Sequence, residues 1–239
     1  MKDKVAIVTG ASSGIGEAVA RLLTKSGAEV ALVARSKTKL EKLSRELPGS
    51  FVVVCDMTDP LAIKKMVKKV VEHYKKIDIL INNAGRGYDA SVEDTNIKTF
   101  NELFNLDLIG PLVAMQEVIP FMKKNKKSSV INISSGTALM ALPNMAAYSG
   151  LKRALAGISL TAREELKHNN ISVGVVYPFI TATDFEKNTI KEGKGTEWSE
   201  DGGNSEIPAA DSPEFIAEKI VKGIETEESE IFAHDWMKK

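Results

Sequence analysis

Short apolar runs alternate along this chain with longer segments of helical periodicity. The apolar runs contain few polar residues, and they lie at 5–9, 30–34, 51–55, 77–82, 129–133, 171–176 and 231–232. Strands that are apolar on both faces are typical of a parallel sheet covered by helices on both sides. The alternation therefore predicts an α/β fold with a single doubly wound parallel sheet, whose ligands bind at the carboxyl ends of the strands.

The segments between the runs are predicted helices, at 15–25, 36–47, 59–74, 100–124, 146–167 and 212–224. Two of them begin with a strong signal, because a capping side chain stands directly before a proline: Asp59 before Pro60 and Ser212 before Pro213. One segment breaks the alternation, since the chain from Glu192 to Ala210 is rich in Gly, Ser and Glu. We expect a substrate loop at about 186–210, either a mobile lid over the site or a long surface loop, and we favour the lid.

The bulk composition is that of an ordinary globular protein. The 239 residues are 43% hydrophobic and 27% charged, which favours one large domain over residues 1–239. The 32 basic and 32 acidic residues cancel, so nothing indicates a nucleic-acid partner. The apolar runs are too short to span a membrane, and no signal peptide precedes the first strand. With Cys55 as the lone cysteine, we expect a cytoplasmic location.

A glycine-rich turn joins the first predicted strand to the first predicted helix. It reads Thr9-Gly-Ala-Ser-Ser-Gly-Ile-Gly16. Gly10 permits a tight turn, Gly14 lets the backbone approach a pyrophosphate, and Gly16 lets the helix pack closely on the strand. The free N–H groups and the dipole at the helix start favour an anion there. This turn predicts a dinucleotide site.

The spacing of these glycines, Gly-x-x-x-Gly-x-Gly, resembles that of the short-chain dehydrogenase/reductase family. Four further segments agree with this family in order and spacing: Asn82–Gly85, Asn132–Ser135, Tyr148–Lys152 and Tyr177–Pro178 with Thr183 beyond. The match spans roughly residues 4–184 and implies a Rossmann-type fold. It also implies that the cofactor is held by Gly10, Ser12, Ser13, Gly14, Ile15, Gly16, Arg35, Asp56, Met57, Asn83, Ala84, Gly85, Tyr148, Lys152, Pro178, Thr181 and Thr183.

The resemblance assigns chemistry to three side chains. Tyr148 and Lys152 are four residues apart, so they share one helix face. A lysine ammonium favours the phenolate, and we expect Lys152 to lower the pKa of Tyr148 for proton transfer and to bond the nicotinamide ribose. Ser135 is expected to hydrogen-bond the developing oxyanion. Ser134 is the competing serine, and the distance of Ser135 from Tyr148 along the chain fits the family better.

The end of the second strand indicates which nicotinamide cofactor is bound. Ala34 occupies the position where an NAD enzyme carries an acid, and Arg35 follows it. Arginine offers a planar, charged fork for a 2′-phosphate, and the Ser12 hydroxyl is a further contact. We therefore expect NADP(H) to be preferred, with NAD(H) as the alternative. Without the family resemblance, Arg35 would be interpreted simply as a surface residue before a helix.

The sequence departs from the family pattern at two places. Counting back three residues from Gly110 gives Asp107, where similar proteins have an Asn that holds a water of the proton relay. An Asp can hold the same water, but its carboxylate adds negative charge. Asp107 is therefore a candidate catalytic residue whose part in the proton relay stays open. Phe179 stands where a Gly usually follows Pro178, and it is expected to narrow the substrate side. The histidines His73, His168 and His234 have no ligand-like spacing, so no metal site is predicted.

The sequence thus predicts an NADPH-dependent oxidoreductase that moves a hydride between nicotinamide and a ketone, an aldehyde or a secondary alcohol. Two alternatives remain, an NAD-dependent alcohol dehydrogenase and a non-catalytic NADP(H)-sensing module on the same fold. Similar proteins assemble through their two long helices, here 100–124 and 146–167. We therefore expect a homotetramer or a homodimer.

Overall fold

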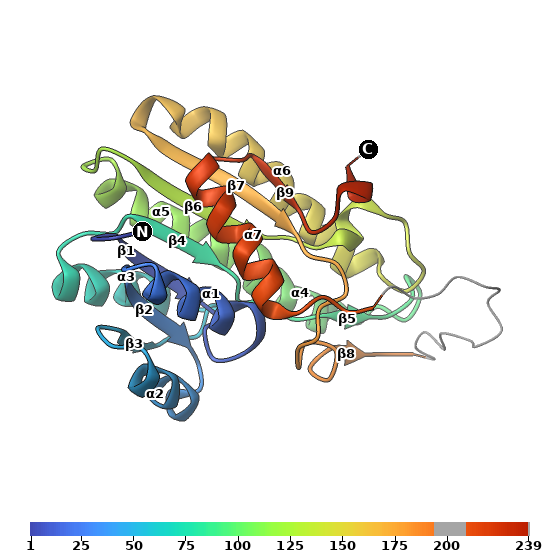
Figure 1. The fold of residues 1–239 in the computed structure, drawn as a ribbon. Coiled ribbons are helices and arrows are strands. Elements are labelled where there is room, and N and C mark those ends of the chain that lie inside the picture. Colours follow the sequence, from blue (N-terminus) through green and yellow to red (C-terminus); the bar gives the residue numbers. More distant parts are fainter. Residues whose placement is uncertain (194–208, 239) are drawn as a thin grey trace.

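The central element of the computed structural model, which describes residues 1–193 and 209–238, is a parallel sheet of seven strands (Figure 1). The strand order is β3-β2-β1-β4-β6-β7-β9, and each neighbouring pair of strands is parallel. The strands are β1 (Val5–Thr9), β2 (Glu29–Ala34), β3 (Phe51–Val54), β4 (Ile79–Asn82), β6 (Ser128–Ile133), β7 (Ile171–Tyr177) and β9 (Glu230–Phe232). The order reverses between β1 and β4, which confirms the predicted doubly wound fold and puts the switch point beside the glycine-rich turn.

Helices cover both faces of this sheet. They are α1 (Gly14–Lys25), α2 (Lys37–Glu46), α3 (Pro60–Tyr74), α4 (Ile97–Phe104), α5 (Gly110–Met122), α6 (Ala146–Leu166) and α7 (Pro213–Thr226). Helices α1 and α7 lie side by side on one face, and α3 and α5 on the other (Figure 1). Alternate residues of β1 serve the two cores, because Ala6 and Val8 pack with α1 and α7 whereas Val5 and Ile7 pack with α3 and α5. This two-sided burial is why the strands are apolar throughout.

The predicted helix starts at Asp59 and Ser212 are confirmed. Asp59 accepts a hydrogen bond from the Leu61 amide at 2.8 Å, and Ser212 accepts one from the Phe215 amide at 3.1 Å. Ser36 stands at the corresponding position before α2, but its hydroxyl makes no capping bond. A side-chain oxygen therefore closes the first turn of α3 and of α7.

The single helix predicted over 100–124 is wrong in detail. The segment begins earlier, at Ile97, and a π-helical turn over Asn105–Ile109 separates α4 from α5. Pro111 has no amide hydrogen to donate one turn back, and a Cβ at Gly110 would lie 2.3 Å from the Met57 carbonyl oxygen. The missing donor and the close approach of the neighbouring backbone explain the wider turn.

A second, two-stranded sheet pairs β5 (Tyr88–Asp89) with β8 (Ile190–Lys191), and it was not predicted. Strands of two residues carry no detectable hydrophobic period. The Glu192 carboxylate extends this attachment, because it accepts hydrogen bonds from the Tyr88 hydroxyl and from the Thr99 hydroxyl. Of the predicted substrate loop at 186–210, residues 194–208 lie outside the described residues, and the prediction of a lid concerns mainly this part.

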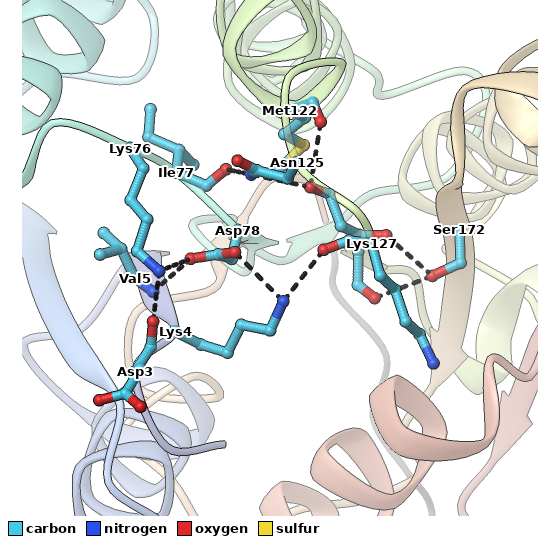
Figure 2. Close-up of polar contacts among 12 residues, drawn as sticks. Asp3, Lys4, Val5, Lys76, Ile77, Asp78, Met122, Asn125, Lys127 and Ser172 are labelled. Atoms are coloured by element: carbon cyan, nitrogen blue, oxygen red, sulfur yellow. Dashed lines mark hydrogen bonds and ion pairs between the residues drawn. The ribbon is translucent and has the colours of Figure 1, made fainter.

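A polar network closes the sheet at the amino-terminal ends of its strands (Figure 2). The buried Asp78 carboxylate accepts a hydrogen bond from the Val5 amide at 2.9 Å and pairs with Lys4 and Lys76, each at 3.2 Å. Nearby, the Asn125 side chain donates to the Ile77 carbonyl oxygen at 2.7 Å. These contacts join β1 and β4 at the edge opposite the glycine-rich turn, so the ligand-binding edge is free of them.

Candidate active site

A cleft of about 590 Å³ lies over the carboxyl ends of the strands. It is lined by every residue predicted to hold the cofactor except Gly16, namely Gly10, Ser12, Ser13, Gly14, Ile15, Arg35, Asp56, Met57, Asn83, Ala84, Gly85, Tyr148, Lys152, Pro178, Thr181 and Thr183. Ser134 and Ser135 line it too, whereas Asp107 does not. Seven separate segments thus converge on one cavity, as expected at the switch point of such a sheet.

The glycine turn forms the floor of the cleft at the start of α1. Gly10 and Gly14 have φ values of +67° and +56°, which favour glycine. Gly16 faces away from the cleft, because a Cβ there would lie 2.4 Å from the Gly10 carbonyl oxygen and 2.5 Å from the Asn83 side chain. Gly16 therefore lets the helix pack closely against the turn, which is the role predicted for it.

The Thr9 hydroxyl fixes the turn to the neighbouring segment, and sequence reasoning missed this role. The side chain is 1% exposed; its hydroxyl donates to the Ile81 carbonyl oxygen at 3.1 Å and accepts from the Asn83 and Ala84 amides at 3.0 and 3.1 Å. Those two amides follow the last residue of β4, so no ladder bond satisfies them. The feature of the sequence that could have indicated this role is the position of Thr9 directly before Gly10 of the glycine-rich turn.

The Tyr–Lys pair lies at the start of α6. Both side chains are buried, and the Lys152 ammonium is 5.7 Å from the centroid of the Tyr148 ring. Lys152 also donates to the Ile133 carbonyl oxygen at 3.1 Å. Ser134 donates to the Lys152 carbonyl oxygen at 2.9 Å, whereas the Ser135 hydroxyl accepts from the Thr137 amide and hydroxyl at 3.2 and 3.0 Å and acts on the Tyr148 phenol, whose pKa it lowers. Of the two serines, Ser135 is therefore the one whose hydroxyl meets the phenol.

Asp107 reaches this group from the π-helical turn. Its carboxylate is fully buried and lies 2.8 Å from the Lys152 ammonium, and its second oxygen accepts from the Arg86 amide at 3.3 Å. Burial raises the pKa of Asp107, against the lowering by the ammonium. Burial works to lower the pKa of Lys152, but Asp107 and Tyr148 outweigh it and raise that pKa. The two side chains form a buried ion pair.

The expected lowering of the Tyr148 pKa is not what the structure gives. Burial raises the pKa of the phenol above its usual value, and Asp107 adds to this effect. Lys152 lowers the pKa, as predicted, and so does the Ser135 hydroxyl, but together they do not compensate. The net direction differs from the prediction chiefly because burial penalises the phenolate, and the Asp107 carboxylate adds to that penalty.

The end of β2 presents Arg35 to the cleft. Its side chain is exposed, and within the described residues it has no hydrogen-bond or ion-pair partner. Asp56, after β3, accepts from both the amide and the hydroxyl of Thr58 at 2.9 Å, so one of its oxygens holds a local turn. The glycine cradle and this free cation fit a phosphate-bearing dinucleotide.

Part of the cleft wall was not predicted. Arg86, Phe185, Asn188 and Ile190 line it, and the ring centroids of Phe185 and Tyr148 are 6.0 Å apart. Arg86 donates to the Asn188 carbonyl oxygen at 2.7 Å, which joins this wall to the segment after Gly85. Asn188 and Ile190 fall in the substrate loop predicted at about 186–210, whereas Arg86, next to Gly85 in the sequence, and Phe185 were not predicted.

A doubly wound sheet with a glycine turn and a buried Tyr–Lys pair at its carboxyl edge defines a nucleotide-binding oxidoreductase. A model of the short chain dehydrogenase family matches residues 4–194, and the chain belongs to this family. It is an enzyme of the oxidoreductase class. Within the described part of the chain, no helix is long and apolar enough to cross a membrane.

Relatives of known name agree with this assignment. The chain is 36% identical over 182 residues to the 3-oxoacyl-acyl-carrier-protein reductase FabG of Thermotoga maritima, covering 74% of each protein. It is similar to a solved short-chain dehydrogenase from Streptomyces avermitilis, with 28% identity, a TM-score of 0.88 and coverage of 99% and 90%. It also resembles an alcohol dehydrogenase from Thermococcus sibiricus solved with 5-hydroxy-NADP, at 27% identity, a TM-score of 0.82 and coverage of 96% and 95%.

Proposed function

We propose that this enzyme is an NADPH-dependent carbonyl reductase that converts a ketone or aldehyde to the alcohol. The observation that carries the proposal is that Ser135, Tyr148 and Lys152 line the same cleft as the glycine turn. Bound NADPH would supply the hydride. Tyr148 donates its phenol proton to the carbonyl oxygen, and Ser135 hydrogen-bonds that oxygen as negative charge develops on it.

Lys152 has a binding task in this proposal. Among the described residues its ammonium donates one hydrogen bond, to Ile133, and pairs with Asp107, and in this proposal it also bonds the ribose hydroxyls of the cofactor. The cradle of Gly10 to Gly14 at the start of α1 receives the pyrophosphate. Thr181 and Thr183 also line the cleft, and in this proposal they meet the carboxamide and phosphate regions.

The preference for NADPH over NADH rests on Arg35. A guanidinium binds a phosphate through charge-assisted bonds, and Arg35 has no described partner that would compete. The Thermococcus sibiricus relative, solved with 5-hydroxy-NADP, supports the same choice. Arg35→Asp should weaken NADPH binding about 10- to 100-fold more than NADH binding. Lys42→Asp makes the same charge change on exposed α2 outside the cleft, and should alter neither; equal losses for both cofactors in Arg35→Asp would refute the preference.

A hydride-transfer assay tests the catalytic assignment. Wild type and Tyr148→Phe are compared with NADPH on a panel of ketones and aldehydes. General acid catalysis contributes about 10²- to 10⁴-fold, so the variant should lose at least 100-fold in kcat while still binding NADPH. A variant as active as wild type would remove Tyr148 from the mechanism. Tight NADPH binding by wild type without turnover of any compound would favour a cofactor-sensing module, and turnover with NAD and alcohols alone would favour an alcohol dehydrogenase.

The partners of the enzyme in this proposal are a small carbonyl or alcohol substrate and further copies of the chain. Large apolar side chains are exposed on and before α4, including Val92, Ile97 and Phe104, at 78%, 67% and 37%. Such a surface favours self-association. We propose a homodimer or homotetramer formed through the long helices. Light scattering at micromolar concentration should give a mass of at least two chains, and a monomer would contradict it.

A further inference from the structure

The buried Asp107–Lys152 ion pair lies directly behind the candidate active site. The carboxylate and the ammonium are 2.8 Å apart, with side-chain exposures of 0% and 5%. Gly85 separates the carboxylate from the cleft, since a Cβ there would lie 2.6 Å from the Asp107 oxygen and 3.2 Å from the Lys152 nitrogen. Asp107 therefore cannot touch a substrate, and any effect it has on chemistry passes through Lys152.

Among the described residues, Lys152 and Asp107 are the charged groups that act on Tyr148, while Arg86 and Glu102 line the same cleft. Lys152 lies one turn along α6, and Asp107 faces the pair from the π-helical turn between α4 and α5. The other titratable group in the same apolar cluster is Tyr88 of β5, whose hydroxyl is bonded to Glu192. A bare ammonium beside a buried phenol would favour the phenolate, whereas a carboxylate 2.8 Å from that ammonium offsets part of its effect on the phenol.

We propose that Asp107 is a positioning residue that neutralises the Lys152 ammonium and thereby keeps the Tyr148 phenol protonated, so that the site rests as a proton donor. This rests on the proposed function, in which the carbonyl carbon gains the hydride of NADPH and the carbonyl oxygen gains the Tyr148 proton. The resulting phenolate then takes a proton from solvent. The same pair makes alcohol oxidation, which needs the phenolate as the base, slow at neutral pH.

The pair also holds Lys152 in place. The second oxygen of Asp107 accepts from the Arg86 amide at 3.3 Å, so the carboxylate is tied to the segment that follows β4. Lys152 is tied in turn to β6 through the Ile133 carbonyl oxygen. Lys152 is thus positioned between two neighbouring strand ends, beside the cleft that it lines.

Asp107→Asn tests the proposal, since the amide keeps the size and one acceptor oxygen but loses the charge. The primary readout is the titration of the ¹³Cζ resonance of Tyr148 in the cofactor-free protein, assigned with Tyr148→Phe. The midpoint should fall by about one pH unit or more in the variant. Asp78→Asn is the matched control, because it removes another buried, lysine-paired carboxylate at the opposite edge of the sheet (Figure 2) and should leave the midpoint unchanged.

The second readout is the pH profile of kcat/KM for alcohol oxidation. In Asp107→Asn its rising limb should move to lower pH by the same amount, giving about tenfold faster oxidation at pH 7, whereas reduction below the midpoint is little changed. An unchanged Tyr148 midpoint in a folded Asp107→Asn would overturn the counter-ion role. Should the variant not fold, wild type alone decides, because a Tyr148 midpoint below about 10, the ordinary value for tyrosine, contradicts the proposal. A shifted midpoint without any turnover would refute the proposed function and leave the counter-ion role standing.

Discussion

The Thr9 hydroxyl offers a sharp test of how the cleft floor is held. It is buried at the end of β1 and joins three backbone groups, the Ile81 carbonyl oxygen and the Asn83 and Ala84 amides. Thr9→Val keeps the shape of the side chain and removes all three hydrogen bonds. The substitution therefore isolates the polar contribution of one hydroxyl to the segment that borders the cofactor site.

The magnitude follows from the number of groups left without a partner. An unsatisfied buried polar group costs about 1–3 kcal/mol, which would give roughly 3–9 kcal/mol for three groups. Asn83 and Ala84 are only half-buried beside the cleft, so water recovers part of the loss at their amides. Valine also gains from burying a methyl group in place of the hydroxyl. We therefore expect Thr9→Val to lower the free energy of unfolding by about 2–4 kcal/mol.

Urea unfolding measures this loss, with the slope m unchanged if only the native state is affected. Thr9→Ser is the matched control, because it keeps the hydroxyl and loses one buried methyl, at a cost of about 1 kcal/mol. NADPH affinity should fall in Thr9→Val and stay near wild type in Thr9→Ser, since the amides border the cofactor site. Equal stability of the two variants would refute the assignment of the three bonds.

Two further predictions concern the walls of the cleft. Gly85→Ala should destabilise the protein by about 1–3 kcal/mol in urea unfolding, because its Cβ would sit 2.6 Å from the Asp107 carboxylate, and a wild-type midpoint would contradict that contact. Hydrogen bonds, chiefly from Tyr88, lower the pKa of Glu192, so the attachment of β8 is complete above the ordinary glutamate pKa of about 4.3 and is lost as pH falls through the lowered value. The Ile190 amide of the wild type should therefore lose protection from hydrogen exchange as the pH falls, whereas Glu192→Gln should remove that pH dependence. The same loss of protection in both proteins would show that the Glu192 carboxylate does not hold β8.

Most of the fold could be predicted from local sequence patterns. The strand runs and the capping pairs at Asp59 and Ser212 were predicted because burial on both faces and helix starts leave a mark within a few residues. The break between α4 and α5 was missed because one of its two causes, the Met57 backbone lying against Gly110, comes from a distant segment, and the other, the missing amide hydrogen of Pro111, was not weighed. The β5–β8 pair was missed because it depends on segments about 100 residues apart.

Residue identities and spacings determined the α/β class and the glycine turn, since each depends on short-range geometry along one strand or one helix, and the family resemblance of the sequence added the Ser135, Tyr148 and Lys152 candidates. The tertiary structure alone decided the electrostatic state of that group. Asp107 and Lys152 are far apart in the sequence and meet only because a π-helical turn and α6 pack together in the interior behind the cleft. Coulomb interactions act through space in a low-dielectric interior, so no local pattern could have revealed that the lysine expected to ionise the phenol is itself paired with a carboxylate.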